Sequence, residues 1–264
     1  MFIISFGVYF IFFNKSVDTY DIDKEGIPKF IDSHFIDLDK IEYIKRFRTY
    51  GSDSSDDFES CRSMNNCFLA FEEFKKPNEV EVYSPITGEI TNIVQTWVNS
   101  SGQWGIQTKD YLTKVTIRYS ENPAFLIKIT FVDIRSTNLK VGMQVLEGQK
   151  LGYVNMDVIG TSIPESLSCI QIIVHTPSGV RYLSYFECMT DNLFEDFIDR
   201  GSSSRDDFII SKEERDADPL TCVYKTTLDS YGVKWIYEKG NIPSWVYLGK
   251  NPEEFEIVYD YTLK

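Results

Sequence analysis

The hydrophobic positions between residues 80 and 187 recur with a period of two in several short runs. Val115-x-Ile117-x-Tyr119 and Ile127-x-Ile129-x-Phe131 alternate with polar residues, which is typical of half-buried β-strands. Glycine and proline punctuate these runs as turns, as at Gly142 and Gly148. The pattern predicts strands near 80–84, 87–97, 103–108, 113–119, 125–133, 143–146, 150–154, 168–175 and 180–184. A compact antiparallel sandwich or barrel follows from strands of this length and spacing.

The segments on either side of this β core have a different pattern. Hydrophobic residues spaced by about three, from Ile36 to Phe47, predict an amphipathic helix over Asp37–Arg48 with Asp37 as its N-cap. After Glu187, the apolar positions 193, 194, 197 and 198 predict a second helix that ends before Gly201. A short helix capped by Ser211 and Glu214 follows. The aromatic C-terminal tail is expected to pack back on the core as strands or loops.

The first thirteen residues are almost wholly apolar. This run is too short for a standard membrane span of about 20 residues and has the length of a signal-peptide core. No Lys or Arg precedes it and no small-x-small cleavage site follows, so export, N-terminal anchoring and a buried element of the fold all stay open. We therefore divide the chain into a signal or anchor segment (1–15), an N-terminal flank with helix and acidic loop (16–79), a β domain (80–187) and an acidic, aromatic C-terminal extension (188–264).

The formal net charge of −13 argues against a nucleic-acid partner and against an anionic membrane bound through the folded surface, because both require a basic surface. A membrane is expected to be engaged only through the N-terminal segment. The charge is also uneven, since residues 80–186 carry equal numbers of acidic and basic residues and the acidic excess lies in the two flanks. Solvated surface explains that excess, and a docking surface for a basic partner is the alternative.

Five cysteines give an odd count, which leaves at least one thiol free. Cys169 and Cys188 lie in apolar, strand-like contexts, where we expect buried free thiols. Cys61 and Cys222 lie in polar contexts on the two flanks, and we hypothesise a disulfide between them; the alternative is a chain without disulfides. Because no Cys-x-x-Cys pair occurs, a thiolate zinc site is not expected.

Two motifs in the β core resemble those of lysostaphin-type peptidoglycan endopeptidases. The run Tyr83-Ser84-Pro85-Ile86-Thr87-Gly88-Glu89-Ile90 is similar to an early strand-turn of that family, and residues 139–152 are similar to its glycine-valine turn. Biotinyl-lipoyl domains and sugar-transport domains share the second turn. The resemblance covers roughly residues 48–187 and implies a mainly β fold, an antiparallel β-sandwich or barrel of the duplicated hybrid motif type, with short flanking helices.

In the resembled family, an early His-x-x-x-Asp and the second His of a late His-x-His hold a catalytic zinc ion. The early motif falls on Ser52 and Asp56, so the Asp is kept and the His is replaced. The late motif falls on Cys169 and Gln171, and a further histidine of the family falls near Val132. The resemblance therefore implies a degenerate member without a bound cofactor. The chain's two histidines match no ligand position: His34 is expected at the surface, and His175 in a strand or turn with a local hydrogen bond.

We accordingly expect a catalytically inactive lysostaphin-like domain that acts as an exported envelope, periplasmic or extracellular binding or regulatory protein. Peptidoglycan or a partner cell-envelope protein is the expected ligand. One alternative is a divergent metal-dependent hydrolase that uses Asp56, His175 and Cys169 with zinc. A second alternative is a purely structural interaction module with acidic docking flanks. No Gly-x-Ser-x-Gly elbow, P-loop, Rossmann glycine motif or His-Glu-x-x-His favours another enzyme class.

Overall fold

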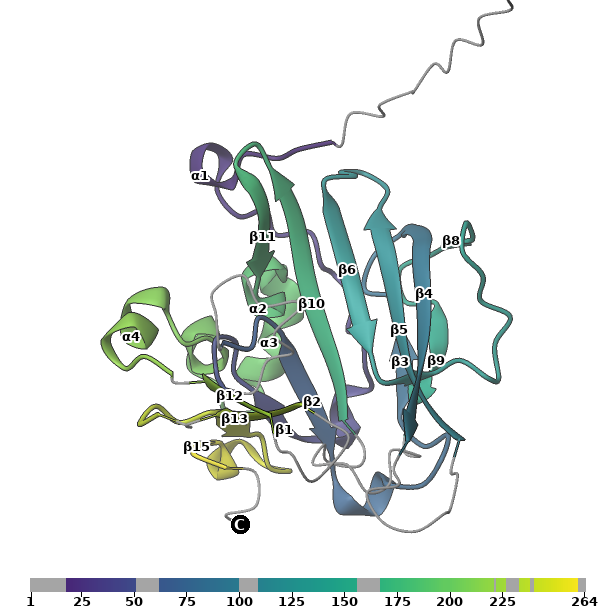
Figure 1. The fold of residues 1–264 in the computed structure, drawn as a ribbon. Coiled ribbons are helices and arrows are strands. Elements are labelled where there is room, and N and C mark those ends of the chain that lie inside the picture. Colours follow the sequence, from purple (N-terminus) through teal and green to yellow (C-terminus); the bar gives the residue numbers. More distant parts are fainter. Residues whose placement is uncertain are drawn as a thin grey trace, which may run out of the picture.

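The computed structural model describes residues 18–50, 62–99, 109–155, 167–220, 222–226, 233–237 and 240–260. Within them, a large antiparallel sheet has the strand order β15-β14-β1-β2-β10-β6-β5-β4-β8, and β11 pairs with one edge of β10. Figure 1 shows β10, β6, β5 and β4 side by side. The strands are β1 (Ile41–Lys45), β2 (Asn66–Ala70), β4 (Gly88–Asn99), β5 (Lys109–Tyr119), β6 (Phe125–Thr130), β8 (Gln144–Val145), β10 (Leu167–Thr176), β11 (Gly179–Leu183), β14 (Trp245–Tyr247) and β15 (Glu256–Val258).

A smaller sheet completes the β core. It consists of β3 (Glu81–Tyr83), β9 (Lys150–Val154) and β7 (Val132–Asp133) in that order. Its apolar residues Val82, Leu151 and Val154 share one buried cluster with Ile117 and Ile127 of the large sheet. The main core therefore lies between the two sheets, as expected for a sandwich. A separate hairpin pairs β12 (Cys222–Thr226) with β13 (Val233–Tyr237).

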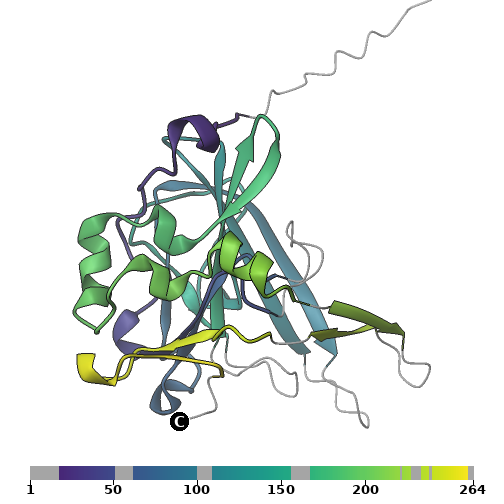
Figure 2. The same cartoon turned by 90° about the vertical axis from the view of Figure 1, so that its left-hand side faces the viewer.

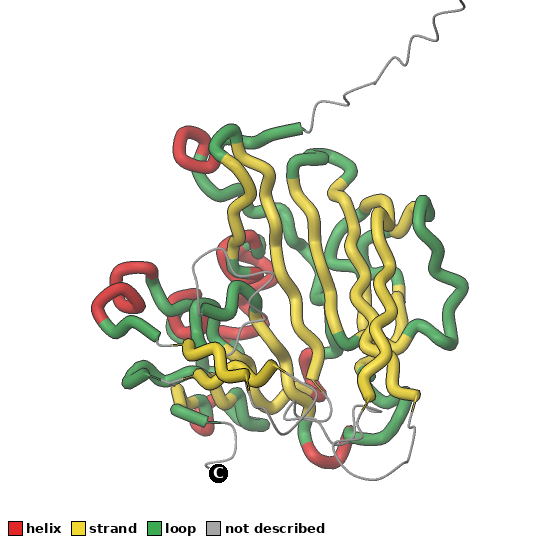
Figure 3. The backbone as a smooth tube through the Cα atoms, viewed as in Figure 1, coloured by secondary structure: helices red, strands yellow, loops and turns green. Residues whose placement is uncertain are grey.

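The helices are short and lie mostly on the β1, β2 and β11 side of the molecule (Figure 3). They are α1 (Ile22–Glu25), α2 (Tyr185–Cys188), α3 (Asp191–Ile198) and α4 (Lys212–Ala217), with 3-10 turns η1 (Leu38–Lys40), η2 (Glu72–Phe74), η3 (Arg205–Phe208) and η4 (Pro252–Glu254). On α3, Phe194 and Phe197 are buried against Phe186 and Phe208. No helix among the described residues is long and apolar enough to cross a membrane.

The mainly antiparallel β fold expected from the sequence is confirmed. Strands occur at every predicted position of the core that the structure describes, and the predicted strand at 103–108 lies outside the described residues. Gly142 and Gly148 have φ values of 87° and 70°, which only glycine adopts without strain, so the two predicted turns are also confirmed. The helix at 191–198 and the capping box of Ser211 with Glu214 occur as predicted. The division into domains stays a prediction.

The predicted helix over Asp37–Arg48 is wrong. Only a 3-10 turn forms at η1, and strand β1 follows it between β14 and β2. The register of β1 shifts between Ile41 and Tyr43, so the strand contains an irregularity of the bulge type. Because a bulge adds one residue to one strand, Ile41 and Ile44 both face the main core despite their spacing of three. A spacing of three is also typical of the buried face of a helix, so the sequence pattern predicted a helix at this strand.

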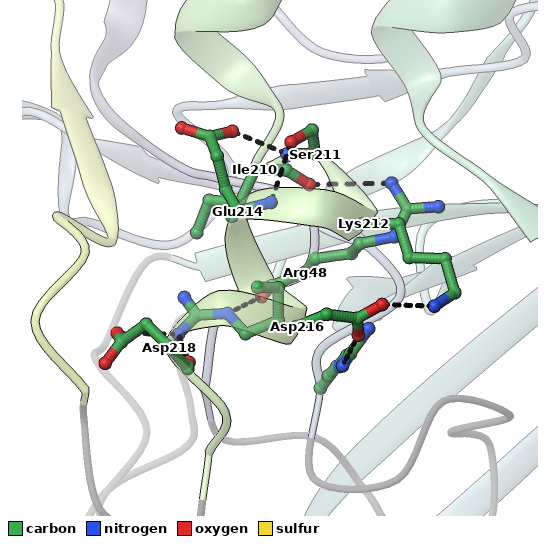
Figure 4. Close-up of polar contacts among 9 residues, drawn as sticks. Arg48, Ile210, Ser211, Lys212, Glu214, Asp216 and Asp218 are labelled. Atoms are coloured by element: carbon green, nitrogen blue, oxygen red, sulfur yellow. Dashed lines mark hydrogen bonds and ion pairs between the residues drawn. The ribbon is translucent and has the colours of Figure 1, made fainter.

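Buried arginines attach the C-terminal segment to the N-terminal one. The side chain of Arg215, on α4, is fully buried, and its Nε donates to the backbone oxygen of Arg48 at 3.0 Å (Figure 4). Its guanidinium also donates to the backbone oxygen of Asp218 at 3.1 Å. Arg46 donates in the same way to the backbone oxygens of Pro243, Asp206 and Ile209. Apart from the contact between Arg215 and Asp218, these hydrogen bonds join residues more than 150 positions apart. Figure 2 shows the resulting arrangement, with β14 and β15 at the end opposite α1.

Candidate binding face

The face of the large sheet that points away from the main core carries polar side chains. On β6, Ile127 and Ile129 are buried in the main core, whereas Lys128 and Thr130 between and after them are half-buried. Successive side chains of a strand point to opposite faces, so Lys128 and Thr130 lie on the outer face. β5 repeats the arrangement, with Val115 and Ile117 in the core. We call this outer surface of β4, β5, β6 and β10 the polar face.

The strand register aligns these residues into two rows across the sheet. The first row contains four residues that can donate or accept hydrogen bonds: Asn92 on β4, Thr116 on β5, Lys128 on β6 and Gln171 on β10. The second row runs through Lys114, Thr130, Cys169, Cys67 and Lys45, on β5, β6, β10, β2 and β1. Exposure falls along the first row from Asn92, which is exposed, to Gln171, which is buried.

The side chain of Gln171 forms a hydrogen bond to the protein backbone. Its side chain is 5% exposed, and its Nε2 donates to the backbone oxygen of Met64 at 3.1 Å. A buried amide with a satisfied donor holds the segment that leads into β2 in place. At the position where the resembled family has a zinc-binding histidine, the chain therefore has a structural hydrogen bond.

Cys169 is joined to Cys67 by a disulfide, and the two cysteines are 102 positions apart in the sequence. The expectation of a free thiol at Cys169 is therefore wrong. Cys67 and Cys169 face each other on neighbouring strands β2 and β10, and this register could not be read from the local context of either cysteine. Cys188, by contrast, is buried and free, as expected, and burial raises the pKa of its thiol well above the usual value.

The remaining positions implied by the resemblance divide into two groups. Val132 lies on β7 with no exposed surface and belongs to the main core, so it offers no ligand. Ser52, Asp56 and Cys61 lie outside the described residues, and the side chain of Cys222 is not described either. The Cys61–Cys222 disulfide therefore stays a prediction.

The two histidines lie outside both rows of the polar face. His34 is half-buried rather than fully at the surface, and its Nε2 lies 2.8 Å from a carboxylate oxygen of Asp196 on α3. His175 lies on β10, as expected, and its backbone N–H donates to the oxygen of Ala124 at 2.9 Å. Over the described ranges, no group of three or more His, Cys, Asp and Glu side chains could hold a metal ion. Val132, disulfide-bonded Cys169 and hydrogen-bonded Gln171 do not fit the zinc site of the resembled family.

Lys45, at the end of the second row, was not identified from the sequence. Burial lowers the pKa of its amine to about 8. Its Nζ lies 5.3 Å from the centre of the Tyr50 ring, a distance at which a cation is attracted to an aromatic face. The alternation of Tyr43 with Lys45 on β1 would have placed this lysine on the outer face, had the segment been recognised as a strand.

No family model and no curated protein matches this sequence. Among solved structures, the chain is similar to the solution structure of lysostaphin, with 15% identity, 53% of this chain and 48% of that chain covered, and a TM-score of 0.32. It is also similar to a putative glycyl-glycine endopeptidase LytM from Ruminococcus gnavus, with 14% identity, 56% and 59% covered, and a TM-score of 0.34. A chain of the SpoIIQ–SpoIIIAH pore-forming complex is also similar, with 11% identity, 66% of this chain and 92% of that chain covered, and a TM-score of 0.33. The chain thus spans less than two thirds of the first two structures.

Proposed function

We propose that this protein is a catalytically inactive lysostaphin-like domain that binds a ligand of the cell envelope without cleaving it. The proposal rests on the bonds that the side chains of Cys169 and Gln171 form. The sulfur of Cys169 is bonded to Cys67, and the amide of Gln171 is bonded to the backbone oxygen of Met64. The Cys169 sulfur cannot act as a thiolate ligand while it is in the disulfide, and an amide such as that of Gln171 is a weak zinc ligand, whereas catalysis by a zinc-bound water needs strong protein ligands together with an open position.

The Cys67–Cys169 disulfide supports an exported location. Disulfides persist in the periplasm and outside the cell and are rare in the reducing cytosol. The apolar run at residues 1–13 adds a possible export or anchoring segment, as inferred from the sequence. Together these two features favour a periplasmic or extracellular protein.

The polar face supplies the binding surface in this proposal. Its first row offers an amide at Asn92, a hydroxyl at Thr116 and an ammonium at Lys128. These groups donate hydrogen bonds to the hydroxyl, amide and carboxylate oxygens that a glycan-peptide carries. Peptidoglycan is therefore the ligand we propose, with an envelope protein as the other candidate.

A sedimentation assay with purified, insoluble peptidoglycan tests the proposal. We expect the full chain to sediment with peptidoglycan, a Lys128→Ala variant to sediment less, and a Lys24→Ala variant on exposed α1 to behave like the unchanged protein. Metal analysis of the same preparation is expected to find less zinc than protein. Stoichiometric zinc with chelator-sensitive release of peptides would instead establish the hydrolase alternative. Absence of sedimentation, with salt-sensitive capture of a basic protein, would establish the interaction module.

A further inference from the structure

A hollow of about 300 Å³ lies away from the polar face, where the N-terminal segment meets the C-terminal extension. It is lined by Asp39, Phe71, Glu73, Phe74, Arg200 and Lys250. These residues come from η1, the η2 region, the turn after α3 and the segment between β14 and η4. A volume of about 300 Å³ is at the small end of the range for small-molecule pockets. The size therefore suits a ligand with few heavy atoms.

Arg200 provides a cation in this hollow, and none of the described residues forms an ion pair with it. Its guanidinium donates to the backbone oxygens of Leu38 at 3.3 Å, Ile41 at 3.2 Å and Gly249 at 2.6 Å. Its Nε is buried and has no hydrogen-bond partner in the part of the chain that the structure describes. A buried donor without a partner is costly, and a hydrogen bond from a guanidinium to a carboxylate is stronger than one to a neutral acceptor. The site therefore favours an anionic group beside Arg200.

Asp39 provides the opposite charge across the hollow. Its carboxylate attracts the Arg200 guanidinium, but no ion pair within 4.0 Å joins the two groups. Within the described part of the chain, no hydrogen bond or ion pair reaches the Asp39 carboxylate. Two opposite charges that face one hollow without touching can be bridged by a ligand that carries both signs of charge.

The other residues that line the hollow are two phenylalanines and the ion pair of Lys250 with Glu73. Phe71 is 5% exposed, and the Nζ of Lys250 lies 5.3 Å from the centre of its ring. The same Nζ forms an ion pair with Glu73 at 2.8 Å. Phe71 is buried and Phe74 is half-buried, so Phe74 offers the larger apolar surface to a ligand side chain.

We propose that this hollow binds a small zwitterion of the α-amino-acid type with an apolar side chain. The carboxylate pairs with Arg200, the ammonium pairs with Asp39, and the side chain packs against Phe71 and Phe74. This site is separate from the polar face, so its test does not depend on peptidoglycan binding.

Isothermal titration of the full chain with L-leucine, N-acetyl-leucine and leucinamide tests the proposal. We expect L-leucine to bind, and the two capped compounds, each lacking one charge, to bind about tenfold more weakly. An Asp39→Asn variant is expected to weaken L-leucine binding about three- to tenfold and to leave N-acetyl-leucine binding unchanged. Asp39 is exposed, so this variant is expected to fold, and Asp23→Asn on α1 is the matched control. No heat with L-leucine at about 10 mM, or equal binding of all three compounds, overturns the proposal.

Discussion

Cys67 on β2 lies directly opposite Cys169 on β10, and a disulfide joins them at the centre of the large sheet. The bond connects a strand that precedes the predicted β domain with the last long strand of that domain. Around it, Tyr43, Leu69 and Trp245 form a second buried cluster on the outer side of the sheet. The disulfide and this cluster together hold β1, β2 and β14 against β10.

Removing this disulfide is expected to destabilise the fold strongly. The bond closes a loop with a sequence separation of 102 residues, and the chain-entropy model gives about 4–5 kcal/mol for a loop of that length. A Cys67→Ala/Cys169→Ala variant should therefore unfold at a lower urea concentration than the unchanged protein, with a steeper slope, because the unfolded chain without the cross-link exposes more surface. A decrease in unfolding free energy below about 1 kcal/mol would contradict the structural role of the bond.

Peptide mapping of the unchanged protein tests the other cysteine pair. Under non-reducing conditions, a peptide that links Cys61 to Cys222 would confirm the disulfide hypothesised from the sequence. Recovery of both cysteines as free thiols in the unchanged protein would show that this hypothesis is wrong. Cys188, which is buried and free, should react only after unfolding.

Replacing Arg215 is expected to loosen the attachment of α4. The Arg215→Met variant loses the hydrogen bonds to the backbone oxygens of Arg48 and Asp218, and both acceptors lose a charged donor. We expect a loss of about 2–3 kcal/mol in unfolding free energy, measured by urea denaturation. Arg118→Met, which changes an exposed arginine on β5, is the matched control and should stay within about 0.5 kcal/mol. Equal effects of the two variants would argue against the buried contact as the cause.

The sequence predicts the β core well because its strands alternate regularly. Positions such as Val115, Ile117, Ile127 and Ile129 repeat with a period of two, and all four are fully buried. Local spacing is sufficient where one face of a strand meets the core and the other does not. The capping box at Ser211 was predictable for the same reason, since both of its residues lie within one turn.

The remaining features depend on contacts between distant segments. The irregularity in β1 gives Ile41 and Ile44 a helix-like spacing, and only pairing with β2 and β14 identifies the segment as a strand. The Cys67–Cys169 pair and the row from Asn92 to Gln171 depend on strand register, which a single sequence does not state. The hollow at Arg200 combines residues more than 150 positions apart, so no local motif in the sequence predicts it.

The carboxyl group of Asp216 is expected to titrate at low pH. Hydrogen bonds from the Lys212 and Arg62 side chains lower its pKa to about 2, from a usual value of 3.8. Because the folded state binds this proton more weakly than the unfolded chain, the contribution of Asp216 to stability is present above pH 4. It is lost as the pH falls towards 2. An NMR titration should show that Lys212→Met raises the pKa of Asp216, whereas Lys24→Met on α1 leaves it unchanged.

The rate of acylation at Lys45 is expected to reach its maximum at a lower pH than the rates at exposed lysines. Burial lowers the pKa of its amine to about 8, so about half of the Lys45 amines are neutral at pH 8, compared with roughly 0.4% for an ordinary lysine. Only the neutral amine is a nucleophile. The rate of Lys45 acetylation, followed by mass spectrometry, should therefore level off above about pH 8, whereas the rates at exposed Lys24 and Lys212 should continue to rise.

The same pKa has a consequence for stability. The folded state binds the Lys45 proton more weakly than the unfolded chain, whose lysine keeps a pKa near 10.5, so this residue makes the fold more stable as the pH rises from about 8 towards 10.5. A Lys45→Met variant should lack that increase, while Lys24→Met should retain it.

A Lys45 acetylation rate that rises in parallel with that of Lys24 up to pH 10 would show that its amine is not held in the buried environment between Tyr50 and the outer side of β1.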